Sequence, residues 1–176
     1  MISMKKIKIL SVFITFVLSF LIHFLYNIYP SILTSILAPV NESVWEHMKI
    51  IYTCILINSF IEYFIYKSKN ISFNNFLISI PITSILSIII YLILYIPLEL
   101  LFGHSLALAT ILLFIIYIIA QIISYYILNS NKIKYGNIIG IILIIVSYII
   151  FTYLTYNPIK NSLFLDTQTN TYGIEK

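Results

Sequence analysis

The sequence predicts an all-α fold, a polytopic bundle of five transmembrane helices. Three observations support this class. The chain of 176 residues is 61% hydrophobic and only 9% charged, whereas soluble domains carry roughly 25% charged residues. Its mean hydropathy is +1.03. Its apolar runs are long enough to cross a bilayer, which takes about 20 residues for each helix. The lipid bilayer is therefore the first partner that we expect.

Charge and cysteine content exclude other classes. The net charge of +4 depends on lysine alone, because the sequence contains no arginine. Nucleic-acid binding requires a basic stripe on a soluble face, and the sequence has none, so we expect no nucleic-acid partner. A single cysteine, Cys54, excludes an internal disulfide.

The first span is expected over residues 9–29, after a short segment rich in lysine. A secretory signal has a shorter apolar region and a small-residue cleavage site, so we expect an uncleaved helix that ends at Pro30. Residues 31–38 are apolar but too short to span a bilayer. They are expected to form a short interfacial or re-entrant segment between the first two spans.

The other four spans are expected over residues 43–66, 76–96, 105–128 and 138–156. Proline is tolerated in the first turn of a helix, which accommodates Pro81 in the third span. Residues 97–104 are expected to form a polar turn. This division gives a transmembrane domain over residues 1–157 and a polar extracytoplasmic tail over residues 158–176.

Lysine positions predict the orientation of the bundle. Lysines gather on alternate connections, at Lys5, Lys6 and Lys8, then Lys67 and Lys69, then Lys132 and Lys134. By the positive-inside rule these segments are cytoplasmic. The N-terminus is therefore expected inside and the C-terminus outside. The start of the second span, the turn before the fourth span and the tail then share the outer side.

Residues 39–49 concentrate polar groups in an otherwise apolar chain, together with the only tryptophan. Helix capping explains part of this pattern. Ser43 followed three residues later by Glu46 matches a capping box, in which serine caps the helix and glutamate bonds back to the cap. Asn41 is an alternative cap, and Trp45 is expected in the interfacial aromatic belt. Capping does not explain His47.

Histidines and carboxylates on the outer side suggest a metal site. His23 lies late in the first span, His47 early in the second and His104 at the start of the fourth. Ionisable groups inside a membrane are costly and usually face a cavity or a partner. Histidine and carboxylate ligands suit Zn²⁺, and we expect His23, His47 and Glu46 as ligands, with Glu42 as the alternative carboxylate. No HExxH spacing is present, so hydrogen-bonded interior histidines are the competing interpretation.

Other polar residues have simpler interpretations. Glu62 is expected to snorkel towards Lys67 at the inner interface, with a proton-relay or ion-path role as the alternative. Gln121 is expected to form interhelical hydrogen bonds. In the tail, residues 163–165 are expected to dock on the outer surface, and Asp166 to form a turn over the cavity mouth. A mobile tail is the alternative.

Several segments together resemble one protein family. The most specific is the run from Asn41 to His47, and the others are residues 23–26, 61–63, 120–121, 157–158 and 163–174. Over nearly the whole chain they resemble an uncharacterised family of small bacterial membrane proteins, domain of unknown function 6512. The resemblance implies a multi-pass protein of the bacterial cytoplasmic membrane, with no established activity or cofactor. The chain departs from the family pattern at Ile159, Thr167 and Asn170, where proline, proline and glycine are expected.

Two function hypotheses follow, and whether the protein is an enzyme stays open. In the first, a non-enzymatic membrane protein binds a small ligand, an ion or a membrane partner, which includes a second copy of the chain, in an outward-facing polar pocket. The candidate binding residues are His23, Asn41, Glu42, Ser43, Glu46, His47 and Asp166. In the second, a zinc ion held by His23, His47 and a carboxylate activates water to hydrolyse a lipid or a peptide.

Overall fold

The long apolar runs of the sequence all form helices. The computed structural model describes residues 3–103 and 105–174, so that His104 lies outside the described residues. The helices are α1 (Met4–Ile28), α2 (Ile32–Leu37), α3 (Val44–Ser68), α4 (Phe76–Phe102), α5 (Leu106–Asn129) and α6 (Gly136–Tyr156). All of these except the short α2 are long and apolar enough to cross a membrane, which gives 5 candidate spans. The predicted all-α class is confirmed, and α2 occupies the predicted short segment between the first two spans.

Two helix boundaries differ by five residues or more from the predicted ones, and the others by no more than two. Helix α1 begins at Met4 and therefore contains Lys8, which we expected in the segment before the first span. Helix α4 continues through Pro97 to Phe102, so the predicted turn from residue 97 is wrong. A proline lacks only one backbone donor, and transmembrane helices tolerate it where other groups satisfy the freed carbonyl. The helix ends instead at Phe102, and Gly103 follows it with a φ of +74° that suits glycine.

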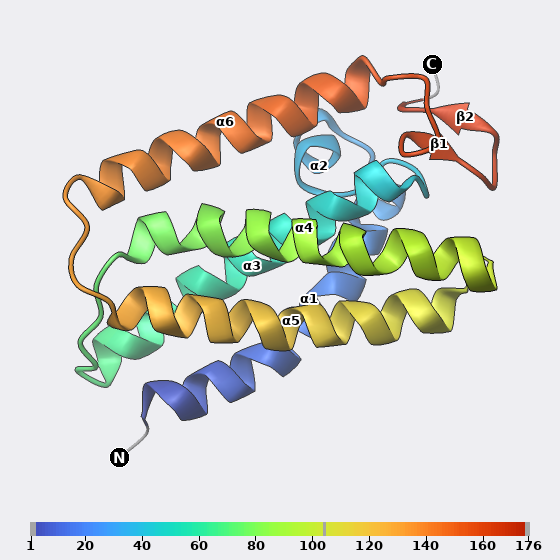
Figure 1. The fold of residues 1–176 in the computed structure, drawn as a ribbon. Coiled ribbons are helices and arrows are strands. Elements are labelled where there is room, and N and C mark those ends of the chain that lie inside the picture. The colour runs from blue at the N-terminus through green and yellow to red at the C-terminus, as the bar shows by residue number, and fades with distance from the viewer. Residues whose placement is uncertain (1–2, 104, 175–176) are drawn as a thin grey trace.

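The helices form a bundle, and different parts of the chain lie at its two ends. In Figure 1, α1 and α6 lie on opposite sides, and α3, α4 and α5 lie between them. Helix α1 packs on α3 and α5, whereas α6 packs on α4 and α2. The chain begins at one end of the bundle, and the strands of the tail lie at the other end (Figure 1). We call these the N-terminal end and the tail end.

Helices α4 and α6 approach each other at Gly140. A Cβ atom at this position would lie 2.4 Å from the backbone carbonyl carbon of Leu77. Small residues allow such close helix contacts in membranes, where van der Waals packing rather than the hydrophobic effect joins the helices. Gly140 therefore fixes the position of α6.

The bundle is apolar on its outside and polar in much of its interior. Large apolar side chains are exposed on every long helix, although α3 exposes them only at Phe60, Ile61 and Phe64. The buried residues include charged and hydroxyl-bearing side chains, among them Lys8, Glu46, Lys49, Thr53 and Glu62. Such a distribution suits a lipid solvent, in which outward apolar groups need no burial and ionisable groups face the bundle interior. The protein is a multi-pass membrane protein.

The tail folds back onto the tail end of the bundle. The buried ring of Phe164 stacks on the Trp45 ring at 4.8 Å between centroids, and the backbone N–H of Trp45 donates to the carbonyl of Leu163 at 2.9 Å. Strands β1 (Leu165–Asp166) and β2 (Thr171–Tyr172) then form an antiparallel hairpin. Asn170 adopts φ +58° in its turn, a conformation that glycine prefers and asparagine tolerates. This geometry accounts for the glycine expected there from the family pattern.

Candidate metal centre

The loop between α2 and α3 carries most of the predicted site residues. Ser43 caps α3, because its hydroxyl accepts the N–H of Glu46 at 3.3 Å. The reciprocal half of the predicted capping box is absent, and that part of the prediction is wrong. The Ser43 N–H donates to Asn41 Oδ1 at 3.0 Å, while the Glu46 carboxylate accepts the Val40 N–H at 3.0 Å. Glu46 points away from the cap because it has a stronger partner, the ammonium of Lys49.

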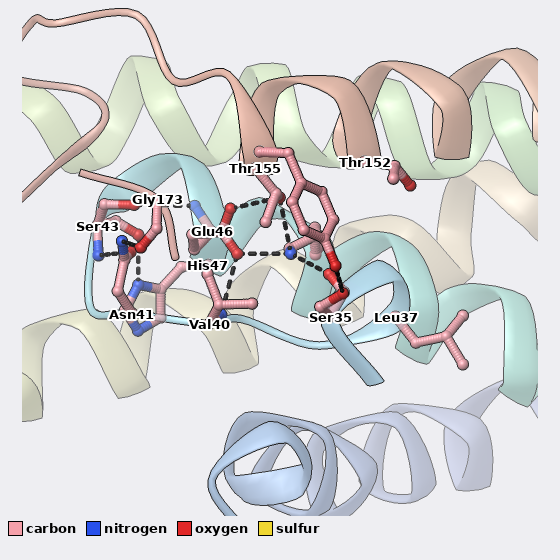
Figure 2. A network of polar contacts seen from close by, with 12 residues as sticks. Ser35, Leu37, Val40, Asn41, Ser43, Glu46, His47, Thr152, Thr155 and Gly173 are labelled. Carbon is pink, nitrogen blue, oxygen red and sulfur yellow. Dashed lines mark hydrogen bonds and ion pairs between the residues drawn. The ribbon is translucent and has the colours of Figure 1, made fainter. Parts of the chain in front are cut away.

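Glu46, labelled in Figure 2, forms a buried ion pair with Lys49 that joins three helices. Their side chains are 2% and 0% exposed, and Lys49 Nζ lies 2.5 Å from Glu46 Oε2. Lys49 also donates to the Ser35 carbonyl at the end of α2, at 2.7 Å, and to Thr155 Oγ1 in α6, at 3.0 Å. The Thr155 hydroxyl in turn donates to Glu46 Oε1 at 2.7 Å. Both oxygens of the predicted ligand Glu46 are therefore bound by donors of the protein.

Glu42, the alternative carboxylate, faces both histidines. Glu42 Oε2 lies 3.3 Å from His47 Nε2 and 3.8 Å from His23 Nε2. One potential ligand atom from each of these three residues lies within 4.8 Å of the others. The two imidazole rings, from α1 and α3, are 5.3 Å apart between centroids. We call His23, Glu42 and His47 the triad.

The orientation of the His47 ring creates a charge requirement. His47 Nδ1 lies 2.8 Å from the Ser43 carbonyl oxygen, which can only accept, so Nδ1 carries a proton. In a neutral imidazole, Nε2 would then present its lone pair to the Glu42 carboxylate. A lone pair facing an anion is repulsive. The arrangement therefore requires either a proton between the two groups, on Nε2 or on the carboxylate, or a metal cation.

The triad carboxylate is ready to bind a cation. The hydrogen bond from His47 lowers the pKa of Glu42 below its ordinary value, although partial burial acts in the opposite direction. An ordinary glutamate has a pKa of about 4.3, so Glu42 is an anion at neutral pH. A histidine whose Nδ1–H donates to a backbone carbonyl is also the usual arrangement around a bound metal.

The remaining predicted site residues hold the loop and the tail together. Asp166 Oδ2 accepts the Glu42 N–H at 3.2 Å, and its Oδ1 accepts the Gln168 N–H at 2.8 Å. Burial raises the pKa of Asp166, but these hydrogen bonds outweigh burial and lower it overall. The Asn41 amide donates to the Gly173 carbonyl at 2.9 Å (Figure 2). Asn41 and Asp166 thus position the backbone of Glu42 rather than facing the histidines.

A cavity of about 480 Å³ adjoins the triad at the tail end. Glu42 and His47 line it together with Tyr95 and Glu99 of α4 and with residues of the tail. The Tyr95 hydroxyl donates to Glu99 Oε1 at 2.9 Å. Tyr95 was missed in the sequence because nothing distinguishes it from the other residues of the apolar third span, and the continuation of α4 is what places Glu99 one turn further on, where it accepts the Tyr95 hydroxyl.

A second buried ion pair lies towards the N-terminal end. Glu62 is 1% exposed, and its Oε2 lies 2.5 Å from Lys8 Nζ, so the prediction that it snorkels towards Lys67 is wrong. The physical reason is the early start of α1, which carries Lys8 into the bundle beside Glu62. Lys8 also donates to Gln121 Oε1 at 3.2 Å. Gln121 therefore forms the interhelical hydrogen bond that we expected.

The Glu46–Lys49 pair predicts a strong effect of one substitution. Lys49→Met should lower the free energy of unfolding by about 3–5 kcal/mol, because it leaves the Glu46 carboxylate buried without a cation. The double variant Lys49→Met/Glu46→Gln should recover most of that loss. Thermal unfolding of the purified protein in detergent measures both, with the exposed Lys160→Met as the matched control. A Lys49→Met variant as stable as Lys160→Met would contradict this account of the tail end.

Comparison with known proteins places the chain in a family. No curated protein and no solved structure matches it. The family model for DUF6512, a family of unknown function, matches residues 1–174. That range includes every helix described above, the triad and the tail hairpin. The chain belongs to the DUF6512 family.

Proposed function

We propose that this protein binds a transition-metal ion, Zn²⁺ in the first instance, through His23, Glu42 and His47 on the outer side of the bacterial cytoplasmic membrane. One observation carries the proposal. Nδ1 of His47 is hydrogen-bonded to the Ser43 carbonyl, and Nε2 of the same ring faces the Glu42 carboxylate, 3.3 Å away. A cation between these atoms removes their repulsion. Imidazole nitrogen and carboxylate oxygen are ligands that zinc prefers.

The distances fit a metal ion as well as they fit a simple ion pair. Two ligands at 2.0–2.1 Å from a tetrahedral zinc ion are roughly 3.4 Å apart. Glu42 and His47 already have this separation at 3.3 Å, and His23 exceeds it only slightly at 3.8 Å. His23 Nδ1 is buried without a hydrogen-bond partner among the described residues. No hydrogen bond of that atom resists the small rotation that would bring His23 to a ligand distance.

A metal-dependent membrane hydrolase is the second candidate function. Three protein ligands leave the fourth zinc position for water or substrate, as in catalytic sites with two histidines and one glutamate. The cavity beside the triad also contains the Glu99 carboxylate, a residue type that can accept the proton of a metal-bound water. The open cavity and the Glu99 carboxylate favour a catalytic zinc site over a structural zinc site that is closed on every side.

The lysine distribution supports an outward-facing site. Lys67 lies in the last turn of α3, and Lys69, Lys132 and Lys134 lie in the connections of the N-terminal end. The positive-inside rule assigns that end to the cytoplasm. The triad and the tail then face outwards. A metal ion at this site would come from outside the cell.

Thiol labelling of intact cells tests the orientation. In a Cys54→Ser background, a membrane-impermeant maleimide should label Thr169→Cys, an exposed tail position, without lysis. It should label Asn131→Cys, an exposed position at the N-terminal end, only after the membrane is broken. The reverse pattern would place the triad on the cytoplasmic side.

Zinc titration of the detergent-purified protein tests the metal site. After chelator treatment and its removal, calorimetry should detect one Zn²⁺ ion bound per chain. His47→Ala, His23→Ala and Glu42→Gln should each weaken binding by about tenfold or more, equivalent to ~1.4 kcal/mol. Cys54→Ser is the matched control, since this potential zinc ligand is buried in the bundle core, outside the triad.

Two outcomes contradict the proposal. Zinc binding that survives all three triad substitutions would locate the ion elsewhere, and no binding would leave the triad as an imidazolium–carboxylate pair. The hydrolase candidate adds one condition, tested with a chromogenic phospholipid ester and a chromogenic peptide. Glu99→Gln should keep zinc binding and lose hydrolysis, and a zinc-loaded wild type that hydrolyses neither compound excludes this candidate for both bond types.

A further inference from the structure

A second hollow, of about 90 Å³, reaches His23 and His47 from within the bundle. The hydroxyls of Ser19 and Thr110 that line it are already hydrogen-bonded, since Ser19 donates to a carbonyl of α1 at 2.6 Å and Thr110 to a carbonyl of α5 at 2.8 Å. We call this hollow the apolar pocket. Most of its other lining side chains are apolar, namely Phe20, Ile50, Ile51, Leu106, Ala109 and Leu113.

The apolar pocket adjoins the cavity of about 480 Å³ beside the triad, which we call the tail-end cavity. The tail-end cavity carries polar groups that the apolar pocket lacks, which are the carboxylates of Glu42 and Glu99 and polar side chains of the tail. The triad therefore lies where an apolar space meets a polar one. Four residues line both hollows: His47, Tyr91, Leu106 and Ala109.

The mouth of the apolar pocket lies between α1 and α5. The residues Ile50, Ile51 and Tyr91, which line it on α3 and α4, are buried. By contrast, Phe20 on α1 is 45% exposed and Leu106 on α5 is 75% exposed. Both helices are candidate membrane spans, and the exposed apolar side chains of such spans face lipid tails that are equally apolar. The apolar pocket therefore opens sideways to the bilayer.

The chemistry of the apolar pocket suits a hydrocarbon chain. A peptide backbone placed there would bury N–H and C=O groups without hydrogen-bond partners, which is costly. An acyl chain brings no such group, and it exchanges one apolar surrounding for another. An apolar cavity of roughly 150 Å³ accommodates benzene, so the pocket of about 90 Å³ holds only a short section of a chain. The rest of that chain would extend through the mouth into the bilayer.

We propose that the ligand of the triad is a phospholipid of the surrounding leaflet. Part of one acyl chain occupies the apolar pocket, an oxygen of the ester or phosphate groups lies at the triad, and the headgroup lies in the tail-end cavity. A bilayer phospholipid is the amphiphile that is present at the mouth of the pocket. Its polar and apolar parts are joined at the ester groups, as the two hollows are joined at the triad.

This inference rests on the proposed metal site, because a zinc ion held by three protein ligands has a fourth position for an oxygen ligand. It extends that proposal in two ways. It selects a lipid rather than a peptide as the ligand. It also assigns a role to Ala109, since this small residue lines both hollows and a larger side chain there would separate them.

Lipid titration followed by native mass spectrometry tests the inference. Dioleoyl phosphatidylethanolamine is titrated into the zinc-loaded, full-length protein in detergent, and the fraction of chains that carry one lipid gives the affinity. Ala109→Phe places a ring in the space that the two hollows share. It should weaken lipid binding about tenfold or more, as overfilling a closely packed site predicts. Ala107→Phe is the matched control, because Ala107 is exposed on the same helix, and it should bind the lipid like the wild type.

Zinc calorimetry before any lipid is added separates this inference from the metal site. Both phenylalanine variants should bind zinc like the wild type. Absence of zinc binding by the wild type overturns the metal site and this inference with it. If zinc binds, equal lipid affinities of Ala109→Phe and Ala107→Phe overturn the lipid inference alone.

Two soluble competitors test the acyl chain itself. Glycerophosphoethanolamine keeps the headgroup but has no acyl chain, and neither it nor a soluble apolar peptide should displace the lipid. Displacement by either compound overturns the inference. Thermal unfolding shows whether each variant is folded, and Leu113→Phe, at a residue that lines the apolar pocket, takes the place of Ala109→Phe if the latter does not fold.

Discussion

The ion pair between Glu46 and Lys49 organises the tail end of the molecule. Removing two charges from water is costly, and their attraction offsets that cost only when further hydrogen bonds satisfy both groups. Here Lys49 finds Glu46, the Ser35 carbonyl and the Thr155 hydroxyl. These partners belong to α3, the end of α2 and α6. The pair therefore fixes α2 against α6 and sets the path of the loop that leads into α3.

That loop gives two neighbouring glutamates opposite roles. Glu46 is neutralised inside the bundle, whereas Glu42 precedes the helix cap and faces the imidazoles of His23 and His47. The tail reinforces the difference, because Asp166 holds the Glu42 backbone through its N–H. The same segment thus supplies both the structural anchor and the candidate metal ligand.

Composition alone was sufficient to predict the spans, because the length of an apolar run is a local property of the sequence. The docking of the tail was also predictable, from the apolar residues 163–165 beside a helix start rich in aromatic and polar groups. The Lys8–Glu62 ion pair was not, because its two residues are 54 positions apart. Glu46 and Lys49 are neighbours on one helix, but the burial of their pair depends on Thr155, which lies 106 positions after Lys49. The sequence places Glu46 next to His47, but it does not show which group binds the Glu46 carboxylate.

Helix α1 carries His23 at the triad and a polar face below it. The central claim is that His23, Glu42 and His47 together hold a cation. X-ray absorption at the zinc edge of the zinc-loaded protein tests it most directly. Two imidazoles and one carboxylate predict nitrogen and oxygen neighbours at about 2.0–2.2 Å, with the outer-shell signal of two imidazole rings. A sulfur neighbour at about 2.3 Å, or a spectrum without imidazole, would contradict the account.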